Sequence, residues 1–120
     1  MKSVVAAGPL RVTDLGRLAY AEALVLQHRV NRQVAEGVEP PVLLLVEHDP
    51  VITISRRKSA PEHLLASASQ LRGLGIDVQP TDRGGDITYH GPGQLVAYPV
   101  LCLRPLGLNL GGYMRMLERV

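Results

Sequence analysis

The chain has 120 residues and a mass of 13.0 kDa, which is enough for one domain or part of one. Hydrophobic residues make up 46% and charged residues 20%, and 13 Lys and Arg against 11 Asp and Glu give a net charge of +2. This balance excludes a disordered or collagen-like chain and does not favour a nucleic-acid binder. The four aromatic residues are all tyrosines, so the sequence offers no stacking platform for single-stranded nucleic acid.

The single cysteine, Cys102, excludes a disulfide within the chain and any paired-cysteine metal site. One unpaired cysteine is typical of a reducing compartment. No run approaches the 18 apolar residues of a membrane span, and Val4–Ala7 is too short for the core of a signal peptide. The sequence therefore predicts a cytoplasmic protein.

The first element that the sequence predicts is an amphipathic helix. Thr13 or Asp14 can cap it, and Gly37 followed by Pro40 can end it. Apolar residues recur at steps of three and four along one face, at Leu15, Ala19, Ala23, Leu26, Val30 and Val34.

Strands and short helices follow. The continuous apolar run Val42–Val46 predicts a strand buried on both faces, and the β-branched run Val51–Ile54 predicts a second strand. Ser59–Glu62 and Ser67–Gln70 both have the spacing of a capping box, so a short helix is expected after each serine. Ile76–Gln79 is predicted to be a short strand.

Ile87–His90 reads as a short strand between glycines, and Gln94–Leu103 as a core strand in which Pro99 requires a bulge or an edge position. Asn109 can cap a last helix, whose inward face would be formed by Leu110, Tyr113, Met114 and Leu117.

That helix reaches Val120 without a glycine, a proline or a polar tail. We therefore expect residues 1–120 to be the N-terminal part of a single longer domain. A short protein that ends on a docked helix is the alternative.

Most literal motifs of catalysis are absent or weak. There is no phosphate-binding P-loop and no nucleophile elbow. Ser55–Lys58 matches S-x-x-K by letters but lacks its companion motifs, so a solvated turn is the better interpretation. Adjacent residues of an extended chain seldom share one metal ion, so Glu47–Asp49 is predicted to be a turn with a locally hydrogen-bonded His48. Cys102, between two leucines, is interpreted as a small buried hydrophobe.

One segment stands apart, because Thr81–Gln94 places four glycines, an arginine, a tyrosine and a histidine within fourteen residues. Paired glycines allow close backbone approach and leave N–H groups free to bind oxygen. Arg83 can hold a carboxylate, phosphate or carbonyl oxygen, and His90 can donate or accept near neutral pH. The residues alone leave two interpretations open, a ligand-binding loop and a plain hairpin.

Arg83 to Gln94 reads R-G-G-x-x-T-Y-H-G-P-G-Q and is followed by Tyr98-Pro99. This pattern resembles the lipoyl (octanoyl) transferase family. Upstream, the segment from Leu43 to Arg56 is similar to that family's L-L-L-x-E-H-x-P-V-x-T-x-G-R stretch, with Ser55 in place of the usual glycine. The resemblance covers nearly the whole chain, from the first helix to Leu117.

The resemblance implies an α+β fold, a mixed sheet with packed helices similar to the catalytic module of biotin and lipoate protein ligases, incomplete in this chain. It implies transfer of an octanoyl group from octanoyl-acyl carrier protein to a lysine of a lipoyl domain, in 2-oxoacid dehydrogenase complexes or the glycine cleavage protein. Neither a cofactor nor a metal is implied. The residues it implies for acyl-substrate binding are Arg83, Gly84, Gly85, Asp86, Ile87, Thr88, Tyr89 and His90.

The family's catalytic cysteine and lysine belong to P-C-G and A-I-G motifs, and neither motif occurs in these 120 residues. We therefore expect the pair to lie beyond Val120 and the chain alone to be inactive. Two alternatives remain. A lipoate–protein ligase shares the fold but activates its acid with ATP, and its fingerprint has three glycines and an H-D pair where this chain has two glycines and His90-Gly91. A non-catalytic chain that only binds an acyl carrier or a lipoyl domain is the other.

Overall fold

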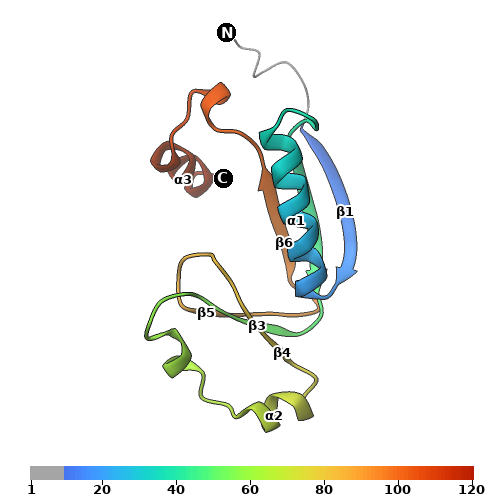
Figure 1. Cartoon of the computed structure of the whole chain (residues 1–120), viewed down its shortest axis with the longest axis vertical. Helices are drawn as coiled ribbons and strands as arrows, with labels where there is room; N and C mark the ends of the chain where they lie inside the picture. Colours follow the sequence, from blue (N-terminus) through green and yellow to red (C-terminus); the bar gives the residue numbers. More distant parts are fainter. Residues whose placement is uncertain (1–9) are drawn as a thin grey trace.

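The computed structural model describes residues 10–120, which form two three-stranded sheets at opposite ends of the molecule (Figure 1). In the first sheet, β2 (Val42–His48) lies between β1 (Arg11–Leu18), to which it is parallel, and β6 (Leu95–Val100), to which it is antiparallel. In the second, β3 (Val51–Ile54) is parallel to β4 (Asp77–Pro80) and antiparallel to β5 (Ile87–His90). The expected mixed α+β architecture is confirmed.

The core lies between the first sheet and helix α1 (Tyr20–Ala35), which covers one face of that sheet (Figure 1). Burial alternates along β2, as expected when every second side chain faces the helix. The buried core residues are apolar and come from α1, β2 and β6: Val34, Val42, Leu44 and Val100. On the other face Val12 pairs with Leu43, and Leu43 with Pro99, in a row that no helix of residues 10–120 covers.

The start of the predicted first helix is wrong, because β1 occupies residues 11–18 and α1 begins only at Tyr20. The Asp14 carboxylate accepts a hydrogen bond from the Gly16 N–H at 2.9 Å, and Gly16 has a positive φ of 68°. Both features are incompatible with a helical turn. The pairing register between β1 and β2 shifts at the same place, between Asp14 and Arg17.

Short helices connect the strands. Ser67 begins α2 (Ala68–Gly73) with the predicted capping box, in which its side chain and that of Gln70 bond reciprocally. The side chain of Ser59 makes no capping bond, and the segment after it is only a 3-10 turn, η2 (Ala60–His63), with Pro61 in its first turn. A second 3-10 turn, η3 (Arg104–Leu106), follows β6.

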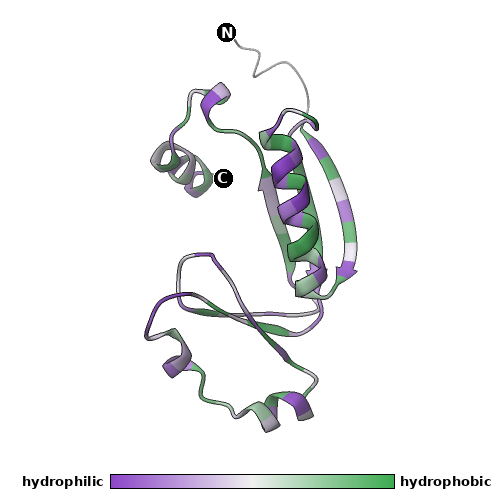
Figure 2. Cartoon of the chain, in the orientation of Figure 1, coloured by the Kyte–Doolittle hydropathy of each residue, from purple (hydrophilic) through white to green (hydrophobic). Residues whose placement is uncertain are grey.

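The last helix, α3 (Leu110–Glu118), begins at the predicted cap, where the Asn109 side chain accepts a hydrogen bond from the Gly112 N–H at 2.7 Å. Its predicted inward face is wrong for this chain. Leu110, Met114 and Leu117 are 70%, 51% and 42% exposed, and α3 stands away from both sheets (Figure 1). Hydrophobic and hydrophilic residues alternate around both α1 and α3 (Figure 2), but only α1 has a sheet to pack on.

Pro99 lies in β6, which pairs only with β2 among the described residues, so the predicted edge position is confirmed. The rest of the strand is less buried than expected, since only Val100 is fully buried. Within residues 10–120, no helix is long and apolar enough to cross a membrane.

Candidate functional site

The segment that the sequence singles out forms a loop and strand β5 of the second sheet. Strand β5 lies beside β3, where Thr88 pairs with Thr53 and His90 with Val51. Because β2 and β3 are joined by a turn at Asp49-Pro50, this pairing brings the segment next to the end of β2. The L-L-L-x-E-H stretch and the R-G-G-x-x-T-Y-H stretch are therefore neighbours in space.

A histidine that sequence reasoning missed lies at this junction. His48 is fully buried, and its ring lies 5.8 Å from the His90 ring and 5.3 Å from the Tyr20 ring, between centroids. Its Nδ1 faces the Leu18 carbonyl at 3.3 Å and its Nε2 lies 2.8 Å from the Tyr98 hydroxyl. The predicted local hydrogen bonding of His48 in a turn is thus wrong, because β2 continues through it and its partners come from β1 and β6. The sequence signal for this histidine was its position in the L-L-L-x-E-H stretch that matches the family pattern.

These bonds fix the protonation of His48. A carbonyl oxygen only accepts, so Nδ1 carries the proton and Nε2 accepts from the Tyr98 hydroxyl. Burial lowers the pKa of His48, while its bond to the Leu18 carbonyl opposes that shift. Burial also raises the pKa of Tyr98. Both shifts favour the neutral pair, in which Tyr98 is a donor and His48 an acceptor.

A cleft of about 440 Å³ opens beside this cluster. Three of the predicted substrate-binding residues line it: Arg83, Thr88 and His90. Tyrosines and aliphatic side chains from α1 and β6 line much of the rest, namely Tyr20, Leu24, Val96 and Tyr98. Thr81, Asp82 and Gln27 complete the lining, and the buried Nε2 of Gln27 has no hydrogen-bond partner among the described residues. The cleft is therefore mostly apolar, with a few polar groups along one side.

The other predicted residues support the loop and do not line this cleft. Tyr89 is 49% exposed, and its ring lies so close to Gly91 that any Cβ there would clash with it. Gly85 has a φ of 93°, and a Cβ on it would lie 2.8 Å from Nη1 of Arg83. Gly84 has an ordinary φ and open space around it, so the structure requires a glycine at position 85 but not at 84.

Arg83 is held against the sheet. Its Nη2 donates to Thr53 Oγ1 at 2.7 Å, and its Nη1 donates to the Gly84 carbonyl at 2.6 Å. Thr53 is fully buried. Arg83 is therefore fixed by two of its own hydrogen bonds, with a fork of five N–H groups that can hold oxygen atoms of a ligand as well.

His90 is bound on one side only. Its Nδ1 pairs with Oε1 of Gln94, across the G-P-G turn, and this bond requires the proton on Nδ1. Among residues 10–120, Nε2 of His90 has no hydrogen-bond partner. His90 therefore both fastens the turn and offers one nitrogen, which can accept a proton or, once protonated, donate to a carbonyl oxygen.

The remaining ionisable residues do not form a second centre. Glu47 accepts a hydrogen bond from the Gly93 N–H, so it holds the G-P-G turn against β2. Cys102 is half-buried against Val34 and the sheet core, as predicted for a small apolar residue. No three His, Cys, Asp or Glu side chains in the described part of the chain come together as metal ligands. His28 is exposed, and His63 is about half-exposed and pairs with Asp86.

Comparisons with known proteins agree with this geometry. The family model described as "Lipoyl protein ligase A/B catalytic domain" matches residues 19–120. The octanoyltransferase of Chloroflexus aggregans is 45% identical over 109 residues, which are 91% of this chain and 49% of the relative. The octanoyltransferase of Solibacter usitatus is 48% identical over 106 residues, 88% of this chain and 48% of the relative. The chain thus spans about half the length of the curated relatives it matches.

Two solved structures share the fold. Protein Ta0514 of T. acidophilum, with lipoic acid bound, superposes with a TM-score of 0.57 at 22% identity. The superposed part is 73% of this chain and 36% of Ta0514. The P. falciparum protein LipL1, in complex with lipoate, superposes with a TM-score of 0.50 at 15% identity. The superposed part is 69% of this chain and 29% of LipL1. The resemblance read from the sequence is confirmed, and the chain belongs to the family of lipoyl protein ligase A/B catalytic domains.

Proposed function

We propose that the full-length protein transfers an octanoyl group from octanoyl-acyl carrier protein to a lysine of a lipoyl domain. The observation that carries this is the cleft beside β5, where Arg83, Thr88 and His90 face an apolar wall. The relatives that are 45% and 48% identical are octanoyltransferases. The acceptors would be the lipoyl domains of 2-oxoacid dehydrogenase complexes and the glycine cleavage protein, in the cytoplasm.

The dimensions and chemistry of the cleft suit this substrate. An octanoyl chain that leaves water gains about 0.8 kcal/mol for each buried CH₂, or about 5 kcal/mol in total. The tyrosine and aliphatic wall provides the apolar surface for it. Arg83 and His90 then provide polar groups for the acyl carbonyl. No residue of the cleft is a nucleophile of the cysteine or lysine type, and Lys58 is exposed in a turn outside it.

We propose that residues 1–120 are the N-terminal part of one domain and that the catalytic pair lies in a further part of the protein. Two observations support this. The chain aligns with only 49% of its relative from Chloroflexus aggregans. In addition, one face of the first sheet and all of α3 lack packing partners in the described residues, with Leu95 and Leu110 69% and 70% exposed. Apolar surface of this kind marks an interface.

A transfer assay tests the proposal. Full-length protein, octanoyl-acyl carrier protein and a lipoyl domain should give an octanoylated lysine, detected by intact mass, without ATP. Transfer that requires ATP would instead indicate the ligase reaction, and no acyl product under either condition would contradict the proposal. Residues 1–120 alone should transfer nothing.

His90→Ala should lower the rate by about a hundred- to a thousandfold, which is typical for the loss of one oriented group at a reacting carbonyl. The exposed His28→Ala is the matched control and should leave the rate unchanged. Since His90 also bonds to Gln94, melting temperature must be measured on the same samples. A lowered melting temperature with unchanged turnover would show that His90 only fastens the turn.

A further inference from the structure

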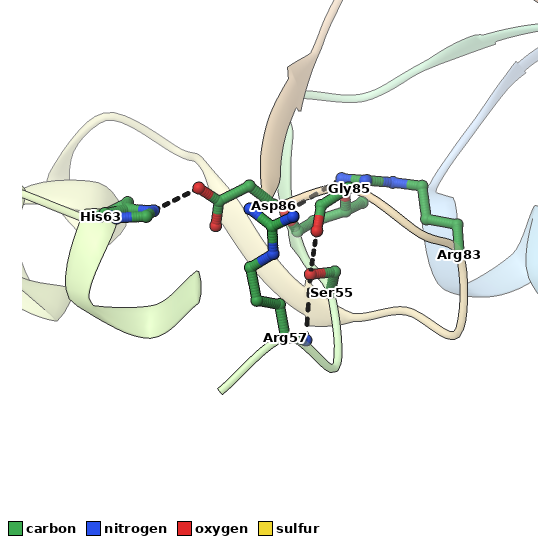
Figure 3. Close-up of polar contacts among 7 residues, drawn as sticks. Ser55, Arg57, His63, Arg83, Gly85 and Asp86 are labelled. Carbon is green, nitrogen blue, oxygen red and sulfur yellow. Dashed lines mark hydrogen bonds and ion pairs between the residues drawn. The ribbon is translucent and has the colours of Figure 1, made fainter. Parts of the chain in front are cut away.

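Ser55 stands at the end of β3, where the related pattern has a glycine, and its side chain is engaged rather than solvated. Ser55 is only 6% exposed. Its hydroxyl donates to the Gly85 carbonyl at 2.7 Å and accepts from the Arg57 N–H at 3.2 Å (Figure 3). Its own N–H donates to the Asp86 carbonyl at 2.9 Å. A glycine at position 55 would retain only the last of these bonds.

The bond to Gly85 fixes the orientation of a peptide plane. In a trans peptide the carbonyl and the following N–H point in opposite directions, and no cis peptide occurs among the described residues. When Ser55 holds the Gly85 carbonyl, the Asp86 N–H is therefore directed away from Ser55. Arg83 acts in the same way one residue earlier, because its bond to the Gly84 carbonyl directs the Gly85 N–H away from that carbonyl.

The loop from Arg83 to Asp86 is thereby fixed at several points. Arg83 donates to Thr53 and to the Gly84 carbonyl, and the Gly85 carbonyl accepts from Ser55. The Asp86 carboxylate pairs with Nδ1 of His63 (Figure 3), which holds that end of the loop on η2.

We propose that Ser55 is a positioning residue of the acyl site: its hydroxyl holds the Gly85 carbonyl and thereby fixes the loop from which Arg83 reaches the cleft that binds the acyl substrate. This inference rests on the proposed octanoyl transfer and adds a residue to it. Ser55 contacts the loop and not the substrate, so its effect on the reaction passes through Gly85. The S-x-x-K letters at this position thus mark a structural hydroxyl and not a nucleophile.

Ser55→Ala in the full-length protein tests this role, with Ser59→Ala as the matched control, because Ser59 lies in the same segment and its side chain makes no capping bond. We expect Ser55→Ala to lower kcat/KM for octanoyl transfer about five- to tenfold, the worth of one net hydrogen bond. Backbone amide exchange at positions 55 and 57 should accelerate, while exchange at Val46 in β2 stays unchanged. Ser55→Thr, which retains the hydroxyl, should recover most of the rate.

The two proposals fail in different ways. If the unmodified protein transfers no octanoyl group, the proposed function is wrong, and the role of Ser55 falls with it. If it transfers normally and Ser55→Ala matches Ser59→Ala in both kcat/KM and amide exchange, octanoyl transfer stands and the inference about Ser55 is wrong. A faster amide exchange with unchanged kcat/KM would show that the hydroxyl ties the loop without positioning the substrate, which also overturns it.

Discussion

The two sheets of this chain are stabilised by different interactions. In the sheet of β1, β2 and β6, the buried residues that face α1 are mostly aliphatic, such as Val42, Leu44 and Val46. In the sheet of β3, β4 and β5, several buried positions near the site are polar, namely Thr53, Ser55 and Thr81. Hydrophobic packing is non-directional, whereas hydrogen bonds fix orientation. The first sheet therefore supplies stability, and the second supplies the geometry of the substrate loop.

The largest expected effect is on the packed sheet. Leu44→Ala removes a side chain that is 3% exposed in the core against α1, and should lower the free energy of unfolding by about 2–5 kcal/mol. Val25→Ala, at a position of α1 that is 69% exposed, is the control and should change it little. Chemical denaturation measures both. Equal effects of the two substitutions would show that the first sheet is not the stabilising core.

A smaller effect is expected in the loop, where two adjacent glycines differ. Gly85→Ala forces a side chain into a left-handed φ of 93° beside Arg83, which should cost about 1–2 kcal/mol. Gly84→Ala should cost far less, because the space around it is open. The loss at Gly85 should also reduce octanoyl transfer in the full-length protein. If the two alanines behave alike in denaturation and in transfer, the observed loop conformation is not the functional one.

Acidification should weaken the junction between the sheets. The pKa of the buried His48 is lowered in the folded state, so below its unfolded pKa of about 6.5 the unfolded chain binds the proton more readily. Stability is therefore fully present above that pH and declines as the pH falls toward the folded pKa. Thermal melts at stepped pH should show this decline, and His48→Gln should reduce it, whereas the exposed His28→Gln should not. A decline that persists in His48→Gln would assign it to other groups.

The smallest effect on the whole fold is expected at α3. Asn109→Ala removes the cap of a helix that has no buried residue, so about 1 kcal/mol is lost from that helix alone. Helical content measured by circular dichroism should fall slightly in residues 1–120, and the main unfolding transition should not move. Ser67→Ala, which removes the capping box of α2, provides the comparison. A shift of the main transition by Asn109→Ala would mean that α3 is docked on the folded core.

Local patterns predicted those elements whose structure depends on neighbouring residues. The β-branched run at Val51–Ile54, the capping box at Ser67 and the cap at Asn109 all occur as expected. Where a distant partner decides the structure, the same reasoning failed. By periodicity Leu15 looks like the first apolar residue of a helix, but pairing with β2 and the turn at Gly16 make residues 11–18 a strand.

In the candidate site, too, features set by neighbouring residues could be predicted and features set by distant residues could not. Arg83, Thr88 and His90 could be chosen from the sequence, because they belong to one glycine-rich segment that the resemblance covers. Their surroundings could not be chosen in this way. Tyr20 reaches the cleft from α1, more than sixty residues earlier in the chain, and Tyr98 reaches it from β6, about ten residues later. Likewise, no spacing rule connects Ser55 with Gly85 across thirty residues, and only the pairing of β3 with β5 brings them together.

Residue-resolved binding of octanoate tests the central claim most directly. The full-length protein, labelled with ¹⁵N, would be titrated with octanoate and its amide resonances followed. We expect the amide chemical-shift changes to cluster around the cleft of β5 and β6, at Arg83, Thr88, His90 and Val96. A second cleft between α1 and β4 adjoins the first, shares Leu24, Thr81 and Asp82 with it, and is distinguished by Arg56 and Val78. Shifts confined to that second cleft, or no saturable shift at all, would contradict the assignment of the acyl site.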